Sequence, residues 1–473
     1  MSEENTGKMG LMSLTLFSVS AVLVIDTLTA SASLGPSAIT WWLITLVLFV
    51  IPYGLISIEL GTTYPGEGGI YDWVKRAYGS RWAVRTTWFY WINVALWMPA
   101  VYIMFAGMFA EMFAPGLGIW WQILICIALT WVTIYICNVS VDAGVWVVNA
   151  GAAAKIVVIA VLGIGGFVYA IQNGVANEFT WASMTPNFDS ALGFLPVIVF
   201  NLLGFELIAT MGSEIKNARR DIPVSIFLSA ALVTGLYIFG TIGILMAMPV
   251  EEIGLVAGLI ATLQKLFGTG AFGTFMVYSV GILALFTFVS NMVTWTMGAS
   301  RAAQEAATTG ELPATVARED TVRRTPTGAN NITGIVSTIV VVLYGLVLTM
   351  LGTATGDELF WTVFAFSSCI FLLPYLFMFP AHLKLRRIDP DAERPFKIGG
   401  GMVTQYLLAG VSFLFVAQAV LLFVFPEIFS GVVDWAYTIP VALGVLVTIG
   451  VGEYLLSGAE KRMSGIVAET PAE

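Results

Sequence analysis

Long apolar runs separated by short polar segments cover the chain from about residue 10 to residue 457. Each run has about 20 residues or more, the length that an α-helix needs to cross the hydrocarbon core of a bilayer. Twelve such runs are centred near residues 22, 51, 99, 128, 159, 201, 237, 286, 342, 369, 414 and 446. Alternating strand patterns of about ten residues are not found. The pattern therefore predicts an all-α membrane protein with twelve transmembrane helices.

The composition agrees with this prediction, because 58% of the 473 residues are hydrophobic and only 11% are charged. A soluble chain of several domains carries more charge. The first residues, MSEENTGK, lack the basic start and the cleavage site of a signal peptide, so we expect the first run to remain as a span. The longest hydrophilic stretch, residues 301–331, is too short for a separate domain. One domain over residues 1–473 is predicted.

Basic residues mark one side of the predicted spans, because the cytoplasmic loops of membrane proteins are enriched in Lys and Arg. With the N-terminus in the cytoplasm, nineteen of the 21 bases fall in cytoplasmic segments, and Lys265 is the one base left for an external loop. The sequence thus predicts a multi-pass protein of the cell membrane with both termini in the cytoplasm. The net charge of -9 does not indicate a nucleic-acid partner.

Side chains suited to catalysis are few. His382 is the single histidine, no His-Glu-x-x-His motif occurs, and Cys126, Cys137 and Cys369 show no metal or redox spacing. We therefore expect no metal, no cofactor and no enzyme activity, and we interpret the cysteines as packing residues. A channel or a nutrient transceptor is a further alternative, although no selectivity-filter sequence or ring of like charges is visible.

Three segments between the apolar runs combine glycine, proline and charge. They read ELGTTYPGEGGIYDWVKRAYG at 59–79, FNLLGFELIATMGSEIKNARRDIP at 200–223 and SRAAQEAATTGELP at 300–313. The proline and glycines near residue 66 break a helix and allow a tight turn, and the bases anchor helix ends at an anionic membrane surface. By themselves these properties indicate a polytopic transporter or a channel.

In these segments the chain resembles the amino acid, polyamine and organocation superfamily of permeases, and the likeness extends from Leu11 to about Pro395. The resemblance implies a LeuT-like fold with inverted repeats at about 10–171 and 190–380 and two additional helices at about 403–457. It also implies a secondary active transporter that moves amino acids or related organic amines across the bilayer by alternating access. A permease specific for polyamines or monoamines is the alternative.

The resemblance further implies a small-molecule site at the bilayer midplane, where spans 1 and 6 unwind. The implied substrate-binding residues are Val24, Ile25, Asp26 and Thr27 in span 1 and Asn201, Gly204 and Phe205 in span 6. Gly204 favours a break, since glycine costs about 1 kcal/mol in a helix interior relative to alanine. Relatives often carry Gly-Ser-Gly at the span 1 break, and this chain departs from that pattern.

Asp26 is a carboxylate in the middle of an apolar run, where a charge costs about 2.5 to 3.5 kcal/mol even on lenient scales. A carboxylate at the site repels an acidic substrate and attracts an ammonium group. We therefore expect an organic amine, a diamine or a cationic amino acid as substrate. Two alternatives stay open, because Asp26 is also interpretable as protonated at rest or as paired with a base such as Lys155.

Two more residues are candidates for coupling. Glu206 is a carboxyl group in span 6 that can exchange protons, and its alternative role is to cap the broken backbone. Lys155 is the only base inside an apolar run, and in several relatives a lysine of span 5 takes the place of a sodium ion. The resemblance thus implies sodium-independent transport, either coupled to protons or by exchange. The alternative for Lys155 is snorkelling to the surface, and Glu59 is interpreted as a gate or a structural group.

Overall fold

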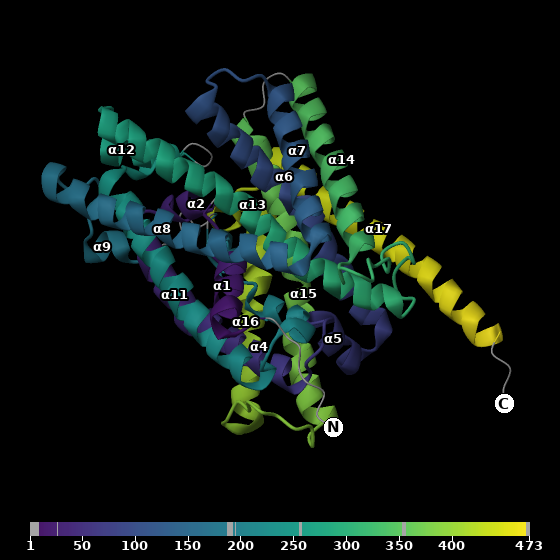
Figure 1. Cartoon of the computed structure of the whole chain (residues 1–473). Coiled ribbons are helices and arrows are strands. Elements are labelled where there is room, and N and C mark those ends of the chain that lie inside the picture. Colours follow the sequence, from purple (N-terminus) through teal and green to yellow (C-terminus); the bar gives the residue numbers. More distant parts are fainter. Residues whose placement is uncertain are drawn as a thin grey trace.

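The computed structural model describes residues 9–25, 27–186, 193, 195–254, 258–351 and 356–469. In this part of the chain the regular elements are helices (Figure 1), and no β-strand longer than an isolated bridge forms. The all-α fold class predicted from the hydropathy pattern is confirmed.

The helices of the first half begin after the polar N-terminal segment. They are α1 (Leu11–Val22), α2 (Leu28–Ala32), α3 (Ser37–Thr45), the π-helix η1 (Leu46–Val50), α4 (Ile51–Thr63), α5 (Ile70–Tyr78), α6 (Ser80–Phe113), α7 (Ile119–Val139), α8 (Val141–Asn173) and α9 (Trp181–Met184).

The second half is built in the same way from long helices and short connecting ones. They are α10 (Leu195–Phe200), the 3-10 helix η3 (Phe205–Glu214), α11 (Ala218–Ala247), the 3-10 helix η4 (Val250–Glu252), α12 (Gly258–Phe267), α13 (Ala271–Thr308), α14 (Thr327–Leu351), α15 (Gly356–Ile388), α16 (Gly401–Val424), the 3-10 helix η5 (Ile428–Ser430) and α17 (Trp435–Glu469).

Eleven helical segments of the described residues are long and apolar enough to cross a membrane, and they coincide with the second to twelfth predicted runs. The first predicted run is present as two shorter helices, α1 and α2, and α1 has only 12 residues. A straight helix of that length does not cross the hydrocarbon core. The described residues thus contain eleven membrane-crossing segments and the divided first run, close to the twelve predicted, and the protein is a multi-pass membrane protein.

The first and sixth predicted runs are both interrupted near their middle. Helix α1 ends at Val22, and Leu23 already has an extended backbone with φ -79° and ψ 103°. In the sixth run α10 ends at Phe200, and Gly204 adopts φ 118° before η3 begins. This conformation lies in the region that favours glycine, so the local sequence accounts for the second break.

Close packing of α8 on α11 brings side chains of both helices to the first break. At the contact, a Cβ atom added to Gly166 would lie 2.1 Å from the carbonyl oxygen of Gly243, so only glycine permits this approach. Small residues at helix contacts are typical of membrane proteins, because they let two backbones come near each other. Helix α8 carries Lys155 and α11 carries Tyr237, and both residues contact span 1.

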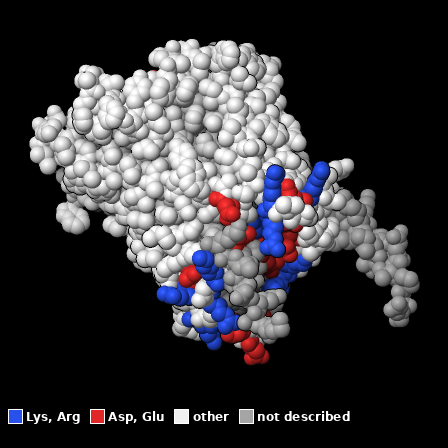
Figure 2. Space-filling view, in the orientation of Figure 1, with Lys and Arg blue, Asp and Glu red and all other residues white. Residues whose placement is uncertain are grey.

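The charged side chains are unevenly distributed over the face of the molecule drawn in Figure 2. On the face drawn in Figure 2, Lys, Arg, Asp and Glu cluster at the end where α5 lies in Figure 1, and the broad remainder of that face carries other residues. A wide uncharged belt is what contact with lipid requires.

Candidate functional site

The two helix breaks lie directly against each other. The Thr27 hydroxyl donates to Oδ1 of Asn201 at 2.6 Å, and Nδ2 of Asn201 donates to the Ser31 hydroxyl at 3.2 Å. Thr27 is 2% exposed and Asn201 is fully buried. The structure thus brings together predicted residues of span 1 and span 6 that are 174 positions apart in the sequence.

Two aromatic side chains satisfy backbone groups that the span 1 break sets free. The N–H of Val24 donates to the Tyr237 hydroxyl at 2.6 Å, and this hydroxyl donates to the carbonyl of Val22 at 2.8 Å. Nε1 of Trp295 donates to the carbonyl of Ala21 at 3.0 Å. Buried backbone groups need such partners. The sequence analysis missed Tyr237 and Trp295, since nothing local distinguishes them from other aromatic residues of the spans.

Three further residues of span 1 were predicted to bind substrate, and the structure describes two of them. Val24 and Ile25 are buried, with 3% and 2% exposure. Asp26 lies outside the described residues, so its predicted contact with an amine stays a prediction.

The span 6 break is held by a tyrosine and a tryptophan. The N–H of Gly204 donates to the Tyr53 hydroxyl at 2.9 Å. A Cβ atom at Gly204 would lie 2.9 Å from Cζ2 of Trp295. Phe205 is fully buried, and its ring centroid lies 5.9 Å from that of Tyr53. Gly204 and Phe205 therefore belong to the packed centre of the fold, beside the first break.

Three tyrosine hydroxyls surround the carboxylate of Glu206, which is 1% exposed. Tyr90 and Tyr375 each donate to Oε1 at 2.8 Å, and Tyr53 donates to Oε2. In the described part of the chain no basic side chain forms an ion pair with Glu206. Because the Tyr53 hydroxyl also accepts the Gly204 N–H, the carboxylate supports the broken backbone through Tyr53.

Lys155 ends among protein groups and not at the surface of the molecule. Its ammonium donates to the carbonyl of Ser20 at 2.6 Å and to Oδ1 of Asn291 at 2.8 Å, and the residue is 1% exposed. The Ser20 hydroxyl in turn lies 2.8 Å from the Thr294 hydroxyl. Lys155 thus joins span 5 to the last turn before the span 1 break and to span 8.

An aromatic cluster borders both breaks. The ring of Phe200, the last residue of α10, lies 5.4 Å from that of Trp97 and 5.2 Å from that of Phe371. Trp295 lies 5.0 Å from Phe371 and 6.2 Å from Trp97. Faces of such rings attract cations.

The three glycine-rich and charged segments meet at the charged end of the molecule. Arg301 of the third segment is 6% exposed, and it lies 3.4 Å from Glu67 of the first and 3.4 Å from Glu214 of the second. Lys75 and Glu311 form a further ion pair at 2.9 Å. These contacts join three segments that belong to different spans.

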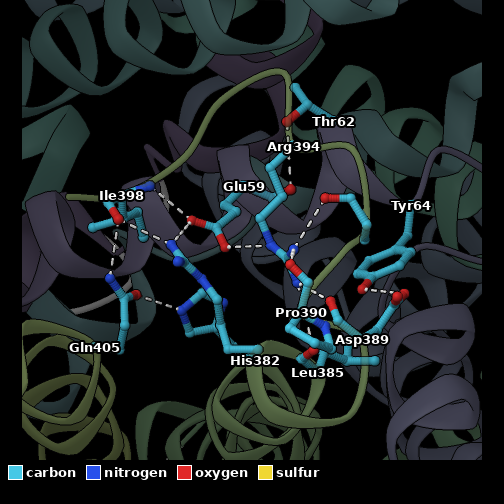
Figure 3. A network of polar contacts seen from close by, with 12 residues as sticks. Glu59, Thr62, Tyr64, His382, Leu385, Asp389, Pro390, Arg394, Ile398 and Gln405 are labelled. Atoms are coloured by element: carbon cyan, nitrogen blue, oxygen red, sulfur yellow. Dashed lines mark hydrogen bonds and ion pairs between the residues drawn. The ribbon is translucent and has the colours of Figure 1, made fainter. Parts of the chain in front are cut away.

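Glu59 lies in a cluster of basic side chains and backbone donors at the same end of the protein (Figure 3). Its carboxylate accepts from Nη2 of Arg386 at 2.5 Å and from the N–H of Ile398 at 2.8 Å, and Nε of Arg394 lies at 3.4 Å. Next to it the Tyr64 hydroxyl donates to Asp389 at 3.0 Å. Burial and this neighbouring carboxylate raise the pKa of Tyr64 to about 12, so Tyr64 stays a donor at neutral pH.

No group of three or more His, Cys, Asp or Glu side chains suited to hold a metal ion occurs among the described residues. Cys126, Cys137 and Cys369 are buried and free, as packing residues are.

These observations together define a class: a multi-pass helical membrane protein with two broken spans that face each other. A family model described as "Amino acid permease" matches residues 9–449, and the chain belongs to this family. The family consists of transporters, so the predicted superfamily is confirmed and the alternative of a membrane enzyme is excluded.

Curated relatives of the chain are also transporters. It is 34% identical over 461 residues to a probable agmatine/putrescine antiporter of Lactococcus lactis, with 96% of both chains covered. It is 24% identical over 382 residues to a glutamate/gamma-aminobutyrate antiporter of the same species, with 78% of this chain and 74% of the relative covered. Among solved structures, a manganese transporter of Eremococcus coleocola superposes with a TM-score of 0.56 at 12% identity, over 97% of this chain and 98% of that one. This last likeness concerns the fold alone.

Proposed function

We propose that the protein is a sodium-independent antiporter of organic amines that works by alternating access. The observation that carries the proposal is the direct contact of the two broken spans through Thr27 and Asn201 at the buried centre of the fold. The surrounding helices rock around a site at such breaks, and the site is therefore open to only one side of the membrane at a time. The relative named as an agmatine/putrescine antiporter supports amines as the substrate class.

The substrate is proposed to bind at Val24, Ile25, Asp26, Thr27, Asn201, Gly204 and Phe205. The carboxylate of Asp26 receives an ammonium group, because opposite charges attract strongly where water is scarce. Thr27 and Asn201 offer neutral hydrogen-bonding groups at the contact of the two breaks. The aromatic cluster around Phe200 supplies apolar surface for the methylene groups of an amine.

Lys155 is proposed to hold the position that a sodium ion takes in sodium-coupled transporters. Its ammonium is a fixed cation between the carbonyl of Ser20 in span 1 and the side chain of Asn291 in span 8. Carbonyl and amide oxygens are ligands that suit a hard cation. The ammonium takes over the contacts that a sodium ion would make, so transport runs by exchange or with protons.

Glu206 is proposed as the group that responds to protons. Its carboxylate is buried among three tyrosine hydroxyls and beside the span 6 break. Protonation turns one carboxylate oxygen from an acceptor into a donor, so at least one of these hydrogen bonds must reverse its direction or break. Such a change favours another arrangement of spans 2, 3, 6 and 10.

The orientation and the repeats complete the proposal. We place the charged end in the cytoplasm, with both termini there, because cytoplasmic segments are rich in Lys and Arg. The inverted repeats are proposed at about 10–171 and 190–380, with additional helices at about 403–457. Breaks in the first span of each set support this division.

Counterflow in proteoliposomes tests the proposed function. Liposomes loaded with putrescine should take up external labelled agmatine or putrescine at the same rate in sodium and in choline buffer. Empty liposomes should show much slower uptake, and a pH gradient distinguishes proton coupling from strict exchange. Steep dependence on sodium, or counterflow with neutral amino acids and none with amines, would overturn the proposal. Sustained ionic current without saturation would indicate a channel.

A further inference from the structure

A cavity of about 500 Å³ opens beside the Glu59 cluster, between the end of α15 and the start of α16. It is lined by Arg386, Pro390, Arg394, Lys397, Ile398, Gly399, Gly400, Gly401 and Met402. Three of these residues are basic and none is acidic. Cavities of roughly 300 to 1,000 Å³ are large enough for a small ligand or a headgroup.

The positive charge of this cavity is only partly compensated. Glu59 lies behind the cavity and contacts both Arg386 and Arg394, which leaves a surplus of positive charge with Lys397. Lys397 forms no ion pair within the described part of the chain. Of the neighbouring acids, Asp389 and Glu393 are bound to Tyr64 and Arg219, at 3.0 Å and 2.8 Å respectively, and Asp391 is exposed on the loop and does not line the cavity.

Arg386 carries a donor without a partner. Its side chain is 10% exposed, and Nη2 donates to Glu59 at 2.5 Å and to the carbonyl of Ile398 at 3.0 Å. Its Nε atom is buried and has no hydrogen-bond partner. Because a buried donor without an acceptor is costly, an oxygen-rich ligand in the adjoining cavity would improve the site.

The backbone at the start of α16 adds donors and space. The first N–H groups of an α-helix have no acceptor within the helix, and they favour anions. Cβ atoms added to Gly399 or Gly401 would meet nothing within 4 Å, so the glycines leave this part of the cavity open. The loop is held in place by Gln405, which donates to the carbonyl of Ile398 at 3.2 Å and lies 2.8 Å from Nε2 of His382 (Figure 3).

From this geometry we propose that the cavity binds a phosphate group through Arg386, Lys397 and the backbone before α16. Arg394 adds positive charge beside them, while its own N–H groups donate to backbone carbonyls and face Glu59. Guanidinium groups match phosphate oxygens in charge and in the direction of their donors. The ligand is the headgroup of an anionic phospholipid, because the adjoining surface of α16 is apolar and outward-facing. Val403 and Leu407 on that surface are 73% and 62% exposed, as residues that contact acyl chains are.

The test uses the full-length protein and two substitutions that place no strain on the backbone. Lys397→Gln removes one charge of the cavity. Gly399→Glu introduces a carboxylate where there is open space, and Gly399→Gln is the matched control of the same size without charge. Arg323→Gln removes an exposed base in the loop between α13 and α14 and controls for the overall charge.

Native mass spectrometry in detergent, with added phosphatidylglycerol or phosphatidylcholine, measures the bound lipid. The parent protein should retain phosphatidylglycerol in preference to phosphatidylcholine. Lys397→Gln should weaken retention by about fivefold, the contribution of one base near a membrane surface, and Gly399→Glu should weaken it further. Gly399→Gln and Arg323→Gln should stay within about twofold of the parent, since exposed charges contribute little.

A titration with inorganic phosphate distinguishes a phospholipid headgroup from free phosphate as the ligand of the cavity. Titration with phosphate at constant ionic strength, followed by thermal unfolding, should stabilise the parent protein little if the headgroup is the ligand. Strong stabilisation that Lys397→Gln and Gly399→Glu abolish would instead assign the cavity to free phosphate. Equal retention of phosphatidylglycerol by all variants, together with no effect of phosphate, would overturn the proposal.

Discussion

The ammonium of Lys155 donates to the backbone carbonyl of Ser20 at 2.6 Å, and this bond joins span 5 to the last helical turn before the break in span 1. A second bond, to Asn291 at 2.8 Å, joins the same ammonium to span 8. Three spans therefore meet at one buried charge, and any movement of span 1 relative to span 8 must change its hydrogen bonds.

Replacement of Lys155 should impair turnover more than folding. In Lys155→Met the side chain keeps its length, whereas Ser20 and Asn291 lose a charged donor. A hydrogen bond to a charged group contributes about 1.5 to 3 kcal/mol, so the exchange rate should fall by about tenfold or more. Amine counterflow in proteoliposomes, with unfolding temperatures measured in parallel, checks this result.

The control for this experiment is Lys265→Met. Lys265 is 40% exposed and lies 3.6 Å from Glu252, and the exchange rate of this variant should be nearly that of the parent. A normal exchange rate for Lys155→Met would mean that the lysine only packs between the spans.

The hydrogen bond between Thr27 and Asn201 should give a measurable coupling free energy between substitutions of these two residues. Thr27→Val keeps the shape of the side chain but removes the donor to Asn201, and the unpaired amide oxygen should cost about 1 to 3 kcal/mol of stability. Asn201→Leu removes the other partner. A double-mutant cycle on thermal or chemical unfolding checks the coupling, and strictly additive effects would show that the contact at 2.6 Å contributes nothing.

Glu206→Gln should disturb the cluster of three tyrosines. An amide offers one acceptor oxygen, so either Tyr53 or the pair Tyr90 and Tyr375 loses its acceptor, at a cost of about 1 to 3 kcal/mol. If Glu206 responds to protons, the exchange rate of the variant should also depend less on pH than that of the parent. Rates over a series of pH values check this, with Glu453→Gln at an exposed ion pair as the control. An unchanged pH profile would leave Glu206 with a structural role.

Asp26→Asn should weaken the binding of amines selectively. The substitution keeps the size of the side chain but removes its charge, and loss of one member of a buried charged pair costs about 3 to 5 kcal/mol. Binding curves for a diamine, a monoamine and a zwitterionic amino acid check the selectivity, with Glu252→Gln in an exposed connection as the control. If the variant binds all three as the parent does, Asp26 serves proton coupling or an internal ion pair.

Glu59→Gln should destabilise the charged end far more than a change at an exposed pair. The carboxylate of Glu59 is 2% exposed and contacts Arg386 and Arg394, and removing one partner of such a cluster costs about 3 to 5 kcal/mol. Arg219→Gln breaks an ion pair whose partners are 66% and 73% exposed, and it should cost at most about 1 kcal/mol. Unfolding temperatures of both variants check this contrast, and equal shifts would contradict it.

The amino-acid sequence by itself determined the class of the protein. Hydropathy is a local property, because a run of about 20 apolar residues crosses a bilayer whatever its neighbours are. The predicted runs therefore coincide with the spans. Gly204 marked the second break through its own backbone preference, and Lys155 and Glu206 stood out because charges are rare in apolar runs.

Only the tertiary structure decided which groups those residues contact. Glu206 meets Tyr90 and Tyr375, which lie 116 and 169 positions away, and Lys155 meets Ser20 at a separation of 135. Such partners depend on how whole helices cross and rotate. Every span offers several hydroxyl and aromatic groups, and the local sequence does not distinguish those that become partners from those that do not. The glycine contact between α8 and α11 selects one crossing among many. Local hydropathy and backbone preference thus located the spans and the second break. Packing geometry, which acts between distant segments, decided which side chains meet there.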